Sequence, residues 1–202
     1  LDCALTETLE TCIAELCEAV RPRTVWQVLP VTHTDTGVLL GDLPLGGKDI
    51  AAHLNGCDAA VLLAATLSAA ADDLIRKAER SDLTRAVMLD AAAGAAIERV
   101  CNDLEAALHS RLDREYAYFT ARFSAGYGDF PLSQQRDLIA MLDAPRRIGL
   151  TVTQNNMLVP MKSVTAVIGL SQQPVQDARR YSCGSSCALC PYRDGCSGQN
   201  QP

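Results

Sequence analysis

Four cysteines near the end of the sequence carry the side chains best suited to bind a metal. They are Cys183, Cys187, Cys190 and Cys196, in the run Cys-Gly-Ser-Ser-Cys-Ala-Leu-Cys-Pro-Tyr-Arg-Asp-Gly-Cys. Four thiolates this close in sequence can surround one zinc ion or one iron–sulfur cluster. Two disulfides or four unreactive thiols are the alternatives that the spacing leaves open. We predict a metal site at these four cysteines, holding either structural zinc or an iron–sulfur cluster.

A second group of chemically useful side chains lies in residues 122–131, which read Arg-Phe-Ser-Ala-Gly-Tyr-Gly-Asp-Phe-Pro. Gly126 and Gly128 permit positive φ and close approach of a ligand to the backbone. Arg122 can bind a carboxylate with two parallel hydrogen bonds, and Tyr127 offers a flat ring and a hydroxyl. Together these groups could hold a small molecule with a carboxylate at one end and a ring at the other. From residue types and spacing alone, a plain strand-to-helix turn with a solvated arginine is the favoured interpretation.

Asp129 belongs to the same segment and has two interpretations. Its carboxylate could pair with the amine of a ligand, or it could cap the helix that is predicted to start near Pro131. We favour the cap, because aspartate is common immediately before a helix.

Hydrophobic periodicity predicts the elements that position these residues. Helices are predicted at residues 3–20, 49–54, 68–80, 81–109 and 132–142, and strands at residues 24–31, 37–40, 59–65, 116–123, 150–153 and 163–169. Alanines and Gly94 in the longest helix suggest a close approach by a neighbouring element, although glycine there costs about 1 kcal/mol relative to alanine. Alternating helices and strands indicate an α/β or α+β fold. Residues 171–202 show no periodicity and are interpreted as a tail.

Length and composition limit the class of protein. With 202 residues and a net charge of −6, we expect one domain, or one domain with an appendage, and no binding to nucleic acid. No apolar run can span a bilayer, and four glutamates within residues 1–20 argue against a signal peptide. We therefore expect a cytoplasmic protein with no membrane attachment. Five cysteines are predicted to be small core residues: Cys3, Cys12, Cys17, Cys57 and Cys101.

Residues 122–131 resemble the Arg-x-x-x-Gly-Tyr-x-x-x-Pro motif of the activation domain of cobalamin-dependent methionine synthase. Residues 147–160 look like the next strand and loop of that domain, and residues 161–169 look like its Ser-Val strand. The resemblance covers residues 20–170 of the chain. It implies an α+β fold, in which helices flank a twisted antiparallel β-sheet, with a Cys-rich tail added. The corresponding domain division is residues 1–170 and residues 171–202.

The resemblance implies a site for S-adenosylmethionine. Arg122 would hold the carboxylate of the methionine part, and Tyr127 would present its ring to the adenosine. The other residues implied to line the site are Ala125, Gly126, Ser163 and Val164. In this family, one electron and the methyl group of S-adenosylmethionine convert inactive cob(II)alamin back to methylcobalamin. The cofactors carry that chemistry and the domain positions them, so no side chain is implied as a general acid or base.

The implied partner is a corrinoid-binding methyltransferase, such as a methionine synthase that lacks its own activation domain, with the cobalamin carried by that partner. An electron donor protein is a further expected partner. An iron–sulfur cluster in the cysteine tail would offer another path for the electron, whereas zinc there would be structural.

Two residues depart from the family pattern. Val167 and Ile168 occupy places where the full-length enzymes have tyrosines near the ligand. This difference supports an alternative function, a non-catalytic module that binds a corrinoid protein, with a degenerate ligand pocket and structural zinc in the tail.

Overall fold

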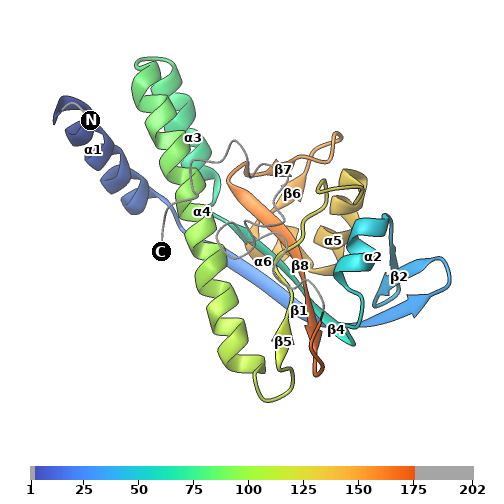
Figure 1. Ribbon diagram of the computed structural model, residues 1–202. Helices are drawn as coiled ribbons and strands as arrows, with labels where there is room; N and C mark the ends of the chain where they lie inside the picture. The colour runs from blue at the N-terminus through green and yellow to red at the C-terminus, as the bar shows by residue number, and fades with distance from the viewer. Residues whose placement is uncertain (1–2, 176–202) are drawn as a thin grey trace, which may run out of the picture. The chain divides into compact units, whose positions relative to one another are not determined.

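A computed structural model describes residues 3–175, which form two compact units (Figure 1). Residues 3–27, 62–111 and 132–166 belong to the first unit, and residues 28–61, 112–131 and 167–175 belong to the second. Three strands contribute residues to both units: β1 (Arg23–Thr34), β4 (Ala59–Thr66) and β8 (Ser163–Ser171). Each unit is described below by itself.

The strands form one six-stranded sheet and one two-stranded sheet. The order in the larger sheet is β3-β2-β1-β4-β8-β5, which includes β2 (Gly37–Leu40), β3 (Leu43–Leu45) and β5 (Tyr118–Phe119). The β1–β2, β2–β3 and β5–β8 pairs are antiparallel. The smaller sheet pairs β6 (Thr151–Val152) with β7 (Leu158–Val159), also antiparallel. This mixture of helices with antiparallel strand pairs confirms the predicted α+β class.

Strand β4 shows how the sequence determines burial. All eight of its residues, Ala-Ala-Val-Leu-Leu-Ala-Ala-Thr, are buried. A continuous apolar run, without alternation of polar residues, is typical of a strand that is covered on both faces. The strand predicted at residues 59–65 is therefore confirmed.

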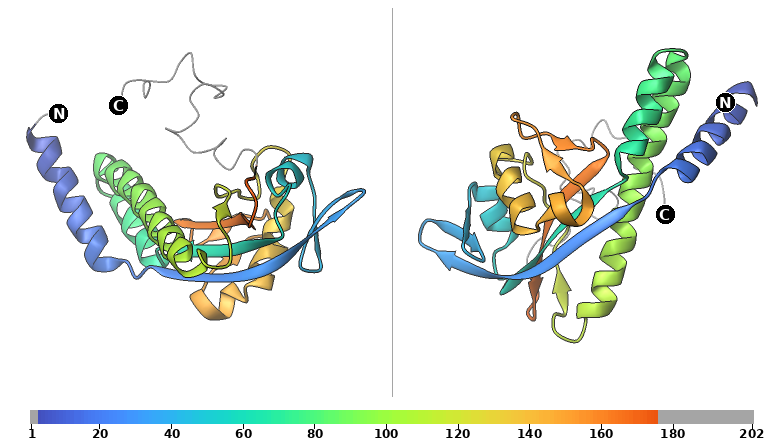
Figure 2. Two further views of the ribbon diagram at one scale, coloured as in Figure 1. Left: turned by 60° about the horizontal axis from the view of Figure 1, so that its bottom comes forward. Right: turned by 180° about the vertical axis from the view of Figure 1, so that it is seen from behind.

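Three helices form the core of the first unit: α1 (Cys3–Ala19), α3 (Ala69–Glu79) and α4 (Leu83–Leu112). Helices α3 and α4 run side by side in both views of Figure 2. Helix α4 begins after Asp82, whose carboxylate accepts the backbone N–H of Arg85 at 3.1 Å, as an N-cap side chain does. One buried apolar cluster contains residues from all three helices, among them Cys12 of α1, Ile75 of α3 and Leu89 of α4. Cys57 and Cys101 are also buried, but the prediction for Cys17 was wrong because α1 exposes it.

Gly94 lies inside α4, where the close approach suggested by the sequence is not found. A Cβ built on Gly94 meets no other described atom within 4 Å. Replacing Gly94 with alanine is therefore expected to raise the free energy of unfolding by about 1 kcal/mol, because alanine restricts the unfolded chain and favours the helix. Denaturant titration of the two proteins measures this difference. A loss of stability on replacement would mean that a neighbouring group occupies the space.

Several short elements differ from the sequence-based prediction. The strand predicted at residues 116–123 is reduced to β5 and a single bridge between Phe123 and Val167. The helix predicted at residues 132–142 divides into a 3-10 turn (Leu132–Gln134) and α5 (Gln135–Met141). Asp143, just beyond its end, takes a left-handed φ of 50°, which does not continue a right-handed helix. Strands β3 and β7 and helix α6 (Ala144–Ile148) were not predicted, since two to five residues carry no readable period.

The part of the chain between residues 3 and 175 contains no helix that is long and apolar enough to cross a bilayer.

Candidate functional site

The predicted ligand-binding segment, residues 122–131, forms a tight turn in the second unit. The N–H of Gly126 donates to the carbonyl of Phe130 at 2.8 Å, and the N–H of Phe130 donates to the carbonyl of Tyr127 at 3.0 Å. Gly126 and Gly128 have φ values of 95° and 53°, in the region that glycine adopts without steric cost. The positive φ predicted for these two glycines is confirmed.

Buried aromatic rings attach the turn to its surroundings. Phe123 exchanges two backbone hydrogen bonds with Val167 of β8, at 2.9 and 2.8 Å. Its ring lies 6.2 Å from that of Phe130 and meets Tyr127 edge-on at 6.1 Å, between centroids. Phe123 and Phe130 are both 1% exposed, whereas Tyr127 is 59% exposed. The turn is therefore fixed by its apolar residues and leaves the tyrosine ring accessible.

Arg122 stands at the start of this turn. The residue is half-buried, and its Nη1 atom is buried. Ala125 is buried within the turn at 7% exposure. A guanidinium and an accessible phenol ring thus lie on one short, well-fixed segment. This set of groups can bind a carboxylate and stack against a planar ring.

The other two predicted site residues belong to the first unit. The hydroxyl of Ser163 bonds with the Thr66 hydroxyl at 2.8 Å and the Pro160 carbonyl at 2.7 Å. Val164 is half-buried and packs against the helical core cluster. The structure therefore brings Arg122 and its three neighbours together on one turn, and it places Ser163 and Val164 at the beginning of β8 in the other unit.

Asp129 caps a different helix from the one predicted. Its carboxylate accepts hydrogen bonds from the backbone N–H groups of Lys48 at 2.7 Å and Asp49 at 2.9 Å, at the start of α2 (Lys48–His53). These bonds stabilise the ionised form and lower the pKa of Asp129. The prediction that Asp129 caps the helix near Pro131 was wrong. The sequence gives no sign that α2, 80 positions earlier, packs beside the turn.

Sequence reasoning missed a buried polar cluster next to the turn. The hydroxyl of Thr120 lies 2.7 Å from Nε2 of His53 and accepts the N–H of Gly169 at 2.7 Å. His53 also stacks on Phe123, with 4.9 Å between ring centroids. Gly169 is needed there, because a Cβ would lie 2.5 Å from Sγ of Cys57. Only tertiary packing joins these residues, so the sequence carries no signal for the cluster.

Burial of His53 predicts a pH dependence of stability. Desolvation lowers its pKa in the folded protein from 6.5 to about 4. Between these values the unfolded chain takes up a proton that the folded protein does not, so stability falls as pH falls. The free energy of unfolding should lose about 2 kcal/mol from this group between pH 7 and pH 5. Denaturant titrations at both pH values measure the loss, which His53→Gln should remove; an equal loss in that variant would contradict the assignment.

Val167 and Ile168, the residues that replace family tyrosines, are 0% and 1% exposed in β8. Their side chains are therefore packed inside the protein. Neither can offer a hydroxyl to a ligand.

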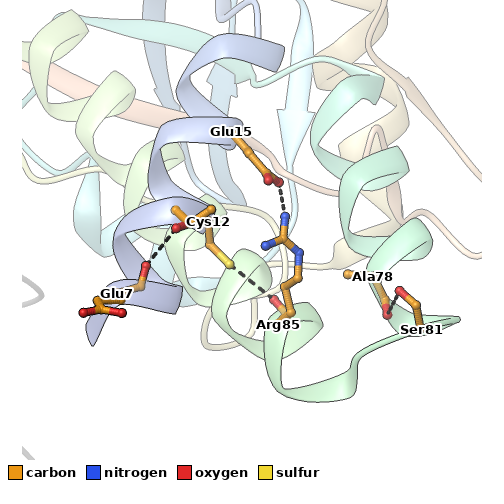
Figure 3. Close-up of polar contacts among 7 residues, drawn as sticks. Glu7, Cys12, Glu15, Ala78, Ser81 and Arg85 are labelled. Carbon is orange, nitrogen blue, oxygen red and sulfur yellow. Dashed lines mark hydrogen bonds and ion pairs between the residues drawn. The ribbon is translucent and has the colours of Figure 1, made fainter. Parts of the chain in front are cut away.

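A pocket of about 460 Å³ lies in the first unit, among α1, α3 and α4. Figure 3 shows Arg85, one of its lining residues, paired with Glu15. The Sγ of Cys12 lies 4.0 Å from the backbone carbonyl oxygen of Arg85. Glu18 and Lys77 also line it. The two carboxylates that line this pocket, Glu15 and Glu18, are matched in number by two cationic side chains, Lys77 and Arg85. The sequence analysis did not predict this pocket.

The predicted metal ligands Cys183, Cys187, Cys190 and Cys196 lie outside the described residues. Within residues 3–175, no three His, Cys, Asp or Glu side chains are grouped as metal ligands. The predicted metal site therefore stays a prediction.

The fold is similar to that of a solved structure, the MetH reactivation domain bound to AdoHcy (S-adenosylhomocysteine). The TM-score is 0.66 and the sequence identity 15%, over 85% of this chain and 66% of that chain. This chain therefore spans slightly less than two thirds of the matched one. No protein-family model and no curated protein matches the sequence. At this identity the likeness establishes the fold alone, and the chain has the fold of the MetH reactivation domain, the activation-domain fold expected from its sequence.

Proposed function

We propose that this chain binds S-adenosylmethionine at the Arg122–Tyr127 turn and reactivates a corrinoid-dependent methyltransferase. The observation that carries the proposal is the turn itself. A cation, two glycines with positive φ and an accessible tyrosine ring occur together on it. The fold around it is one that has been solved with AdoHcy bound, in MetH.

Each residue of the turn has a separate part in this proposal. Arg122 holds the carboxylate of the methionine moiety through charge-assisted hydrogen bonds. Tyr127 stacks its exposed ring on the adenosine, and Ala125 and Gly126 contribute backbone contacts. These residues fit an amino acid joined to a nucleoside, because they pair a guanidinium with an aromatic face.

The proposed reaction is the methylation of a reduced corrinoid. Cobalt accepts one electron from an external reductant, the methyl–sulfur bond breaks, and a cobalt–carbon bond forms. S-adenosylhomocysteine is the other product. The corrinoid belongs to a partner methyltransferase, such as a methionine synthase. The electron comes from a donor protein or from an iron–sulfur cluster at the cysteine tail. The residues of this chain bind and orient the methyl donor.

Calorimetric titration of the purified protein tests the binding step. S-adenosylmethionine and S-adenosylhomocysteine should both bind saturably, because both carry the carboxylate and the adenosine. Methylthioadenosine, which lacks the amino-acid carboxylate, should bind at least tenfold more weakly, because the contact with Arg122 is lost. Absence of heat with all three compounds would contradict the proposal.

The burial of Val167 and Ile168 favours one alternative, a non-catalytic module that binds a corrinoid protein. It predicts no binding of S-adenosylmethionine, together with a stable complex with a corrinoid-loaded methyltransferase.

A further inference from the structure

Two aspartates from distant parts of the sequence hold each other's backbone. The carboxylate of Asp129 accepts the N–H of Asp49 at 2.9 Å, and the carboxylate of Asp49 accepts the N–H of Asp129 at 3.1 Å. Asp129 also accepts the N–H of Lys48 at 2.7 Å. We call this reciprocal arrangement the Asp49–Asp129 latch. It joins the start of α2 to the ligand-binding turn, 80 positions away.

Two glycines make the close approach of these segments possible. A Cβ on Gly47 would lie 2.6 Å from Oδ1 of Asp129, and a Cβ on Gly128 would overlap the carboxylate of Asp49. Both glycines have positive φ, 106° and 53°. Any side chain at either position would therefore force the latch apart. The fit depends on both glycines as well as on the aspartates.

Helix α2 contacts the turn region at both of its ends. At its start, Asp49 binds Asp129 through the latch. At its end, His53 packs on Phe123 and bonds with Thr120. The second contact is buried, whereas Asp129 is exposed and Asp49 half-buried. Opening the latch therefore removes a surface restraint on Gly128, next to Tyr127, and leaves the buried contact in place.

We infer that α2 acts as a brace for the turn, and that Asp49 and Asp129 are positioning residues for the methyl donor. This inference rests on the proposed function. The latch restrains the backbone conformation of Gly128 and Asp129, immediately after Tyr127. Its loss should therefore reduce ligand affinity without unfolding the protein. Neither carboxylate needs to touch the ligand.

Three substitutions test the brace in different ways. Asp49→Ala and Asp129→Ala each remove the acceptor carboxylate, and Gly128→Ala keeps both carboxylates but excludes them sterically. Each should lower the affinity for S-adenosylmethionine about fivefold, on the scale of one lost helix cap. The double Asp→Ala variant should bind no worse than the single variant with the lower affinity, because one latch is broken in all cases. Each variant should stay folded with a lower denaturant midpoint than the wild type, because a lost cap also costs stability.

Asp35→Ala is the matched control, since it removes an exposed carboxylate of the same unit outside the latch. S-adenosylmethionine is a net cation, because its sulfonium and ammonium outweigh its carboxylate, so the loss of a negative charge can itself weaken binding. Gly128→Ala keeps both carboxylates and therefore separates the latch from that charge effect. Wild-type affinity in both Asp49→Ala and Gly128→Ala would overturn the inference. That result, with weaker binding by Asp129→Ala alone, would instead place Asp129 on the ligand.

Amide hydrogen exchange separates failure of the brace from failure of the proposed function. In Asp49→Ala, the N–H groups of Gly126 and Phe130 should exchange at least about fivefold faster than in the wild type. This measurement needs no ligand. Unchanged exchange at both amides would overturn the brace. A wild type that binds no S-adenosylmethionine would overturn only the proposed function.

Discussion

Arg122→Ala should weaken binding of S-adenosylmethionine by about a hundredfold, because it removes a charge-assisted pair of hydrogen bonds to the ligand carboxylate. Arg122→Lys should recover only part of the affinity, since an ammonium cannot make the planar, bidentate contact. Calorimetry measures the affinities. Circular dichroism and thermal unfolding check that the fold survives the loss of this half-buried side chain.

Two controls make this result specific. Arg114→Ala removes an exposed arginine of the same unit, away from the turn segment, and should leave the affinity unchanged. Methylthioadenosine should bind the wild type and Arg122→Ala equally, because it has no carboxylate for the guanidinium to hold. Equal affinity of both proteins for S-adenosylmethionine would exclude Arg122 from the site.

The largest effect on stability is expected from Thr120→Val. Thr120 is 2% exposed. Its hydroxyl forms a hydrogen bond with Nε2 of His53 and accepts another from the N–H of Gly169. Valine has nearly the same shape but leaves both of those buried groups without this partner. An unsatisfied buried polar group costs about 1–3 kcal/mol, so the free energy of unfolding should fall by about 3 kcal/mol. Denaturant titration at pH 7 measures the loss.

Thr120→Ser distinguishes the hydroxyl from the methyl group. Serine keeps the hydrogen bonds and loses one buried methyl, which is worth about 1 kcal/mol. It should therefore be more stable than the valine variant. A valine variant that is as stable as the serine variant would mean that the hydrogen bonds of this cluster contribute little.

The elements predicted best from the sequence are those with long, regular patterns. Helix α1, strand β1 and the buried strand β4 each lie within a few residues of their predicted ranges, because many residues contribute to each pattern. The turn was also predicted, since Gly126 and Gly128 mark positive φ directly. Short pieces such as β3 and α6 contain too few residues to show a period.

Contacts between distant residues could not be predicted. Asp129 looks like the cap of the helix that follows it, yet it binds α2, 80 positions earlier. His53, Thr120 and Gly169 come from three separate segments and meet only in the fold. A single sequence records which residues are buried or turn-forming, but carries little information on which pairs touch.

The most direct test of a ligand site at the Arg122–Tyr127 turn is nuclear magnetic resonance of ¹⁵N-labelled protein during titration with S-adenosylmethionine. The proposed site predicts saturable shifts in the amide signals of Gly126 and Tyr127 and in the Nε–H signal of Arg122. Signals from Glu15 and Arg85, the ion pair of Figure 3 that lines the pocket of the first unit, should not move. Unmoved turn signals at saturating ligand, or shifts confined to that pocket, would contradict a methyl-donor site at the turn.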